Sequence, residues 1–165
     1  MTTIRRFHLD DALATRQVFV DAVRIGAAGR YSAAELLDWV PDPAMPKDWG
    51  PWLDRHLTIV SEDNGQVTGF MMLEANGYLN MAFVRPEAMG KRVADRLYAA
   101  LLDEVHKINL TRLTTLASRY SQSFFSRHGW RPAPEFVGHE DLDPRQGPND
   151  NPMNRPMALD LVPAE

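Results

Sequence analysis

The spacing of apolar residues switches between helical and strand-like patterns along the chain. Helical spacing predicts helices over 11–28, 32–39, 48–56, 90–107 and 121–127. Shorter apolar or alternating runs predict strands over 2–7, 58–61, 66–73, 78–84, 110–116, 130–137 and 157–162. The second helix has a clear start, because Ser32 and Glu35 form a capping box. The segment 139–156, rich in Pro, Gly, Asn and Asp, is predicted to be a long irregular link that is either mobile or a functional lid, and it is where we expect contact with a partner.

The order of these elements predicts the sheet topology. Asn64-Gly65 and Asn76-Gly77 are hairpin signals, so 58–61, 66–73 and 78–84 should form an antiparallel meander. The helix over 90–107 then connects 78–84 to 110–116, and such a crossover predicts that these two strands are parallel. The expected fold class is α+β, or mixed α/β, with a largely antiparallel sheet and one parallel pair.

Composition narrows the kind of protein. A chain of 165 residues with 44% hydrophobic side chains predicts a single domain, 1–165, with a real core. The net charge of −4 argues against a general nucleic-acid binder, and the absence of cysteine excludes disulfides and a Cys nucleophile. No secretory signal or membrane-length apolar run is visible, so we expect a cytoplasmic protein that does not interact with membranes.

Three of the four tryptophans, Trp39, Trp49 and Trp52, fall in one irregular segment. They can pack that segment onto the core or wall a substrate pocket. We expect at least two of them to be structural, because large aromatic side chains are mostly buried in packing roles.

The stretch 77–102 is the strongest candidate for a binding site. An apolar strand ends at Pro86, a short loop follows, and a helix begins, so free backbone N–H groups should point at an anion. Four basic and two acidic residues lie from Val84 to Arg96, about +2 by this count. We expect this turn to hold cofactor phosphates. The five histidines are scattered, so we expect no metal site.

Two motifs carry a resemblance to the GCN5-related N-acetyltransferase (GNAT) family, and the element order agrees with it over nearly the whole chain. The first family pattern, V-x-P-x-x-[RQ]-G-x-G-x-[GA]-x-x-L, is similar to 84–97: Val84, Pro86, Gly90, Ala94 and Leu97 match, while Met89 and Arg92 depart from it. The second, N-x-x-A-x-x-[FL]-Y-x-x-x-G-[FW], is similar to 118–130: Phe124, Gly129 and Trp130 match, while Ser118 and Phe125 replace Asn and Tyr. The segment 31–39 resembles a subgroup of small bacterial acetyltransferases.

The resemblance implies a mostly antiparallel, twisted central sheet of six to seven strands flanked by about four helices. It implies acetyl-CoA as co-substrate, with the pyrophosphate on the N–H groups of 89–94 and the pantetheine arm along the backbone of 81–84. The implied cofactor-binding residues are Ala82, Phe83, Val84, Met89, Gly90, Lys91, Arg92, Val93, Ala94, Ser118, Ser123 and Phe125. The implied partner is a small amine or peptide acceptor, and a homodimer is the base-rate expectation.

The resemblance leaves the acid and base open. The family's acid is a tyrosine at the position of Phe125, which cannot donate a proton; Ser118, Tyr120 or Ser121 can replace it, or act only as cap or turn residues. Asn80 occupies the site expected for a base, so Glu74 is the remaining carboxylate candidate, with an exposed turn residue or a water relay as alternatives. These departures also allow a non-catalytic acyl-CoA-binding or regulatory module, or a structural domain.

Overall fold

The computed structural model describes residues 1–136 and 154–162. The strands within these ranges are β1 (Thr2–Arg6), β2 (Leu57–Asp63), β3 (Gln66–Leu73), β4 (Leu79–Val84), β5 (Arg112–Ala117), β6 (Arg131–Pro132) and β7 (Arg155–Asp160). The α-helices are α1 (Ala12–Asp21), α2 (Ala33–Trp39), α3 (Trp49–Asp54), α4 (Val93–Lys107) and α5 (Gln122–Arg127). A π-helical turn (Ala22–Gly26) extends α1, and short 3₁₀ turns cover Leu9–Asp11, Pro86–Ala88 and Pro134–Phe136. These elements confirm a mixed α+β architecture.

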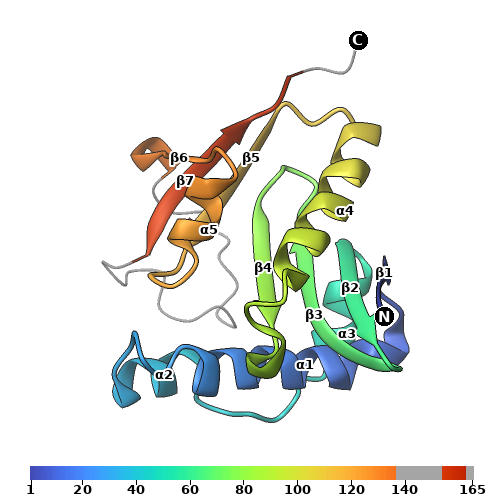
Figure 1. Cartoon of the computed structure of the whole chain (residues 1–165), viewed down its shortest axis with the longest axis vertical. Helices are drawn as coiled ribbons and strands as arrows, with labels where there is room; N and C mark the ends of the chain where they lie inside the picture. Colours follow the sequence, from blue (N-terminus) through green and yellow to red (C-terminus); the bar gives the residue numbers. More distant parts are fainter. Residues whose placement is uncertain (137–153, 163–165) are drawn as a thin grey trace.

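The described strands form two sheets rather than one. The first has the antiparallel order β1-β2-β3-β4, and the second has the antiparallel order β5-β7-β6. The predicted parallel pairing of 78–84 with 110–116 is not confirmed as a ladder, because it is reduced to the single bridge between Tyr78 and Thr114. Figure 1 shows β4 and β5 close at this end and diverging away from it.

The divergence of β4 and β5 begins at a bulge in β4. The pairing register shifts between Met81, which faces Met72, and Leu79, which faces Leu73. A bulge of this kind bends its strand and increases the local twist. The Thr115 hydroxyl donates to the carbonyl of Leu79 over 2.8 Å, which ties β5 to β4 before the two separate. From this point on, β4 is an edge strand of the first sheet.

Helix α4 covers one face of the first sheet, and α1 and α3 cover the other (Figure 1). The apolar stripe of α4 consists of Val93, Leu97, Leu101 and Val105, all of which are buried. The spacing of four residues places them on one side of the helix, as predicted from the sequence. Packing this stripe onto the sheet holds the start of α4 beside the end of β4.

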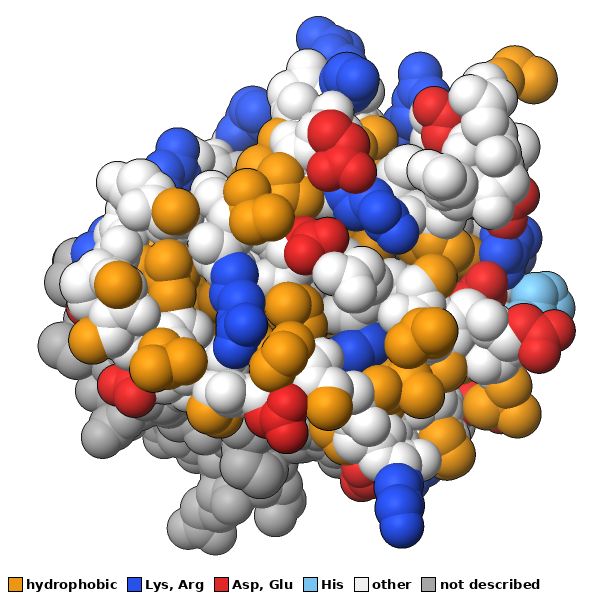
Figure 2. All heavy atoms as spheres, turned by 90° about the horizontal axis from the view of Figure 1, so that it is seen from below, with side chains coloured by type: hydrophobic (Ala, Val, Ile, Leu, Met, Phe, Trp, Pro, Cys, Tyr) orange, Lys and Arg blue, Asp and Glu red, His pale blue; other side chains and the backbone are white. Residues whose placement is uncertain are grey.

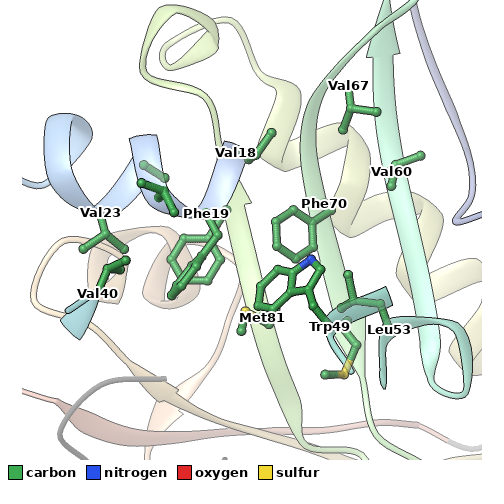
Figure 3. Close-up of a cluster of buried hydrophobic side chains, with 14 of the residues drawn as sticks. Val18, Phe19, Val23, Val40, Trp49, Leu53, Val60, Val67, Phe70 and Met81 are labelled. Carbon is green, nitrogen blue, oxygen red and sulfur yellow. The ribbon is translucent and has the colours of Figure 1, made fainter. Parts of the chain in front are cut away.

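The core on the α1 and α3 face is built around Trp49. Its ring stacks on Phe19 at 5.6 Å between centroids, and its indole N–H donates to the Thr15 hydroxyl over 3.1 Å. Figure 3 shows Phe19, Trp49 and Phe70 gathered together in this cluster. Trp49 and Trp52 are both buried, which confirms the structural role predicted for two of the three tryptophans.

Two predicted elements end earlier than expected. The strand predicted over 130–137 is confined to Arg131–Pro132, and a 3₁₀ turn follows at Pro134–Phe136. Prolines 132 and 134 lack the N–H groups that a longer ladder needs, which explains the short strand. The regular α-helix predicted over 11–28 changes to the π-helical turn at Ala22. Most of the link predicted over 139–156 lies outside the described residues.

The surface beside α1 and α2 is mixed in character. Figure 2 looks onto the molecule from below and shows apolar side chains interspersed with both basic and acidic ones. Exposed apolar side chains in the first 45 residues include Leu9, Leu13, Ile25 and Leu37. In the part of the chain that the structure describes, no helix combines the length and apolarity needed to cross a membrane.

Candidate active site

A cavity of about 720 Å³ opens between the end of β4, the start of α4 and α5. Its volume falls within the range of small-molecule and cofactor sites, roughly 300–1,000 Å³. The lining residues come from strand, loop and both helices: Met71, Ala82, Val84, Ala88, Met89, Gly90, Arg92, Val93, Ala94, Asp95, Tyr120, Ser121, Phe124, Phe125, Arg127 and His128. The lining is therefore largely apolar, with charged groups at the helix ends.

The loop before α4 ends in two residues with left-handed backbone conformations. Gly90 has φ +77°, and Arg92, the N-cap of α4, has φ +62°. The Arg92 side chain makes no capping hydrogen bond, so within the described residues the N–H groups of Val93 and Ala94 keep their hydrogen-bonding capacity for a ligand. Backbone N–H groups at a helix N-terminus, together with the positive end of the helix dipole, favour an anion.

A cluster of three charged or titratable side chains joins α4 to α5 at the lining of the cavity. Asp95 Oδ1 accepts a hydrogen bond from the Arg127 guanidinium over 2.9 Å and lies 2.8 Å from His128 Nε2. The contact with His128, followed by that with Arg127, holds the pKa of Asp95 below its usual range. The His128 ring also packs on the Tyr98 ring, with 4.5 Å between the ring centroids. The sequence reasoning did not place these residues in the site; for Arg127 and His128 the available signal was their position at the end of α5, just before Gly129.

A smaller cavity of about 50 Å³ lies against the large one on the side of α2 and β5. The two share four lining residues: Ala82, Tyr120, Ser121 and Phe125. The remaining lining comes from Trp39, Leu79, Asn80, Phe83, Thr115, Leu116, Ser118 and Asn154. The shared residues place Tyr120 at the junction of the two spaces.

A set of contacts that includes the lining residue Tyr120 connects two segments that are 88 to 90 residues apart in the sequence. The Arg119 backbone N–H donates to the Tyr31 hydroxyl over 2.7 Å, and the Arg30 guanidinium donates to the Tyr120 carbonyl over 3.0 Å. The Arg119 guanidinium in turn donates to the Arg30 carbonyl, lies 4.6 Å from the centre of the Tyr31 ring and lies 3.6 Å from Glu35. We call this set the arginine latch. It fixes the loop 118–121 to the segment 30–35.

The candidate base lies behind the lining of the smaller cavity. Asn80 lines this cavity, and its side-chain N–H donates to Glu74 Oε2 over 3.1 Å. Glu74 itself is half-buried just after β3. Glu74 also acts on His56, because its charge opposes the burial that lowers the pKa of that imidazole. The candidate base Glu74 thus contacts Asn80, the residue at the position where the sequence analysis expected a base.

Two candidate acids occupy the loop after β5. Burial raises the pKa of Tyr120, so its phenol keeps its proton at neutral pH. The Ser118 hydroxyl donates to the Ser121 hydroxyl over 2.9 Å, and Ser121 is the residue before α5. Ser118 therefore has a local structural partner, whereas Tyr120 borders both cavities.

The predicted site residues divide into three groups. Nine line the large cavity: Ala82, Val84, Met89, Gly90, Arg92, Val93, Ala94, Tyr120 and Phe125. Two line only the smaller cavity, Phe83 and Ser118. Three line neither cavity: Glu74, which contacts Asn80, and the exposed Lys91 and Ser123. Among residues 1–136 and 154–162, no three His, Cys, Asp or Glu side chains gather as metal ligands would.

Comparison with known proteins identifies the family. The model of the acetyltransferase (GNAT) domain matches residues 43–139, more than half of the chain. The chain belongs to the GNAT family. No curated protein matches the sequence.

Solved structures of the GNAT fold superpose over nearly the whole chain. A GCN5-related N-acetyltransferase from Rhodopseudomonas palustris has a TM-score of 0.79 at 22% identity, over 98% of this chain and 96% of its own. PaiA N-acetyltransferase from Thermoplasma acidophilum, in complex with coenzyme A, has a TM-score of 0.72 at 16% identity, over 98% and 99%. YncA of Salmonella typhimurium, with its cofactor acetyl-CoA, has a TM-score of 0.66 at 16% identity, over 100% and 96%. At these identities the likeness shows the fold.

Two of the departures from the GNAT patterns, at Arg92 and Phe125, have distinct structural consequences. Arg92 replaces a glycine of the family pattern and adopts the left-handed conformation that glycine adopts without strain. Replacing glycine by Arg92 therefore adds backbone strain as well as a bulky side chain. Phe125, where the family has tyrosine, is buried and packs on Trp130 at 4.9 Å. Its ring is part of the core beneath both cavities.

Proposed function

We propose that this protein is an N-acetyltransferase that moves an acetyl group directly from acetyl-CoA to a primary amine of a small molecule or peptide. The observation that carries the proposal is the divergence of β4 from β5, which leaves β4 as an edge strand beside a 720 Å³ cavity that ends at an uncapped helix N-terminus. Membership of the GNAT family supports it, as do the CoA-bound relatives of the same fold.

The residues around the large cavity fit acetyl-CoA in both charge and polarity. The first-turn N–H groups of α4, with Arg92 and Arg127 beside them, suit the pyrophosphate and the further phosphate of CoA. The edge of β4 offers backbone hydrogen bonds to the amide groups of the pantetheine arm, in the manner of an added strand. Acetyl-CoA would supply a thioester as the acetyl donor and a thiolate as the leaving group.

In the proposed mechanism, the protein transfers protons and stabilises one charge. Glu74 receives the ammonium proton of the acceptor through a bridging water, because the carboxylate lies behind the cavity lining and Asn80 only donates a hydrogen bond to it. A backbone N–H of β4 near 81–83 stabilises the oxyanion of the tetrahedral intermediate. Tyr120 protonates the departing thiolate from the junction of the two cavities, and the second amine proton, on the nitrogen of the tetrahedral intermediate, returns to the Tyr120 phenolate. Its raised pKa suits this role, because it keeps the phenol protonated before transfer.

Two measurements test this proposal. Acetyl-CoA at ~100 times its dissociation constant should stabilise the protein by roughly 2.7 kcal/mol, which a thermal or urea unfolding experiment detects. A thiol-release assay across a panel of primary amines should then show CoA production that depends on the amine. Binding of acetyl-CoA without acetylation of any amine would contradict catalysis and favour the acyl-CoA-binding module.

The acid can be tested separately. Tyr120→Phe should lower kcat by on the order of 10²-fold, because it removes a positioned acid, and should leave acetyl-CoA affinity unchanged. Adding Phe125→Tyr to this variant places a phenol at the family position and should restore part of kcat. An unchanged kcat in Tyr120→Phe would contradict the role given to Tyr120.

A further inference from the structure

The smaller cavity has an unusual lining for an amine-binding site, because none of its described lining side chains carries a charge. Four of them are aromatic: Trp39, Phe83, Tyr120 and Phe125. Phe83 and Trp39 meet at 6.2 Å between ring centroids, so the aromatic side of the cavity is continuous. The polar groups of the described lining side chains are hydroxyls, amides and the indole N–H of Trp39, all of them neutral. A ligand in this space meets rings and neutral dipoles.

The two arginines of the arginine latch, Arg30 and Arg119, do not line this cavity. In the arginine latch, the Arg119 guanidinium is engaged by Glu35 and by the Arg30 carbonyl, and the Arg30 guanidinium by the Tyr120 carbonyl. Both cations are therefore paired within the latch, which joins the loop 118–121 to the segment 30–35. A carboxylate that entered the cavity would lose its water and find no cationic partner among the described lining residues, which is strongly unfavourable.

A positively charged ligand group, in contrast to a carboxylate, has a negative partner near the smaller cavity. Asn80 lines the cavity and connects it to the carboxylate of Glu74 over 3.1 Å. An ammonium group near Asn80 would feel this negative charge, whereas a carboxylate would be repelled by it. The smaller cavity, at about 50 Å³, is narrow beside the large one of about 720 Å³. There is room for an amine and the first atoms attached to it, but little for a branch beside the nitrogen.

We propose that the smaller cavity receives the amine end of the acceptor, and that the acceptor is a primary amine on an uncharged, unbranched arm, an alkylamine or arylalkylamine, rather than an amino acid. This inference rests on the proposed function. It adds the substrate class, and it assigns Trp39 and the arginine latch to acceptor selection. Discrimination of this kind comes from the penalty imposed on the wrong ligand as much as from contacts with the right one.

Three related amines separate charge from bulk. Phenethylamine and phenylalanine differ only by the carboxylate, and phenylalaninamide has the same branch without the charge. We expect kcat/KM for phenethylamine to exceed that for phenylalanine by about 100-fold or more, with phenylalaninamide in between, because an unpaired buried charge and a branch are both penalised. Equal rates for phenethylamine and phenylalanine would overturn the inference. A preference for phenylalaninamide over phenethylamine would also overturn it and would indicate a peptide acceptor.

A binding measurement keeps this inference separate from the proposed function. Calorimetric titration of the same three amines into the CoA-saturated protein reports acceptor binding without turnover. Tighter binding of phenethylamine than of phenylalanine, with no acetylation of either, would support the acceptor class while the proposed catalysis fails. Equal binding, or no binding of phenethylamine, would overturn the acceptor class.

A matched pair of variants tests whether the lack of a cation sets the preference. Trp39→Arg introduces a guanidinium at a lining position, and we expect it to raise the phenylalanine to phenethylamine ratio by about 10-fold or more. Leu37→Arg places the same group at an exposed position of the same helix and should leave the ratio unchanged. Thermal unfolding verifies that both variants fold. If Trp39→Arg does not fold, the three-amine comparison on the natural chain still decides the outcome.

Discussion

The two cavities that meet at Tyr120 are built in different ways. Most of the phosphate end of the large cavity comes from one continuous segment, 82–95, in which strand, loop and helix follow one another. The walls of the smaller cavity come from α2, β4, β5 and the loop 118–121, and the arginine latch joins parts that are 88 to 90 residues apart. Under the proposed function, cofactor binding depends on local backbone geometry, and acceptor binding depends on long-range contacts. Variants on each side should therefore separate the two activities.

The largest effect is expected from a negative charge at the phosphate end of the large cavity. Ala94 lies in the first turn of α4 and lines this cavity. Ala94→Asp should weaken acetyl-CoA binding by roughly 100-fold, because a like charge placed against the phosphates costs several kcal/mol. Calorimetry with CoA measures the change.

The same substitution should leave folding stability intact, because acidic residues are favourable at a helix N-terminus by about 0.3–1 kcal/mol. Ala99→Asp, at an exposed position of α4 outside the cavity lining, is the matched control and should leave CoA affinity unchanged. An equal loss of affinity in both variants would show that the phosphates do not lie at the start of the helix.

On the acceptor side, Tyr31→Phe removes one hydroxyl from the arginine latch. The Arg119 N–H would then lose its partner, at a cost of roughly 1–2 kcal/mol in the free energy of unfolding. We expect KM for the amine to rise several-fold while CoA affinity is unchanged. Urea unfolding and steady-state kinetics measure the two effects. A loss of CoA affinity equal to the rise in amine KM would show that the two cavities are not independent.

The contrast between the two cavities also explains how much the sequence could predict. Local signals determine the strand, loop and helix of 79–107, and the hairpin turns follow from Asn64-Gly65 and Asn76-Gly77, where Gly65 and Gly77 have φ of +78° and +92°. Nine predicted site residues accordingly line the large cavity.

The parts that could not be predicted depend on contacts between distant segments. No short-range sequence pattern predicts the arginine latch. None predicts the divergence of β4 and β5 either, and because of this divergence the strands form two sheets and not the one expected. The Asp95 cluster was missed for the same reason, because its members come from two helices. The Glu74–Asn80 contact needed the bulge in β4 to be known. Sequence reasoning therefore described the cofactor side better than the acceptor side.

Arg92 offers a test of local backbone geometry by itself. Arg92→Gly and Arg92→Ala remove the same charge, but only glycine adopts φ near +62° without strain. The glycine variant should be more stable than the alanine variant by roughly 1 kcal/mol, as judged by urea unfolding. Both should weaken CoA binding by similar, modest factors. Equal stability would show that the backbone at 92 relaxes without cost.

The smallest effect concerns Asp95, which joins α4 to α5 at the lining of the large cavity. Because contacts with His128 and Arg127 hold its pKa below the unfolded value of about 3.9, its charged form stabilises the folded state above that value. This contribution is lost as pH falls through the lowered pKa. Since Asp95 is partly exposed and screened by solvent, we expect it to be below about 1 kcal/mol.

The difference in unfolding free energy between the natural chain and Asp95→Asn should therefore shrink between pH about 5 and about 3. Urea unfolding at several pH values measures it. In a His128→Gln background the pH-dependent part of the difference should decrease, because the hydrogen bond with the His128 imidazole, which lowers the pKa of Asp95 most, is gone. A difference that does not vary with pH would mean that Asp95 acts through its position in the first turn of α4 and not through its charge. In that case packing, such as that of the His128 ring on Tyr98, would hold α4 against α5. The proposed phosphate end of the large cavity would then depend on the backbone geometry of the loop before α4 and not on this ion pair.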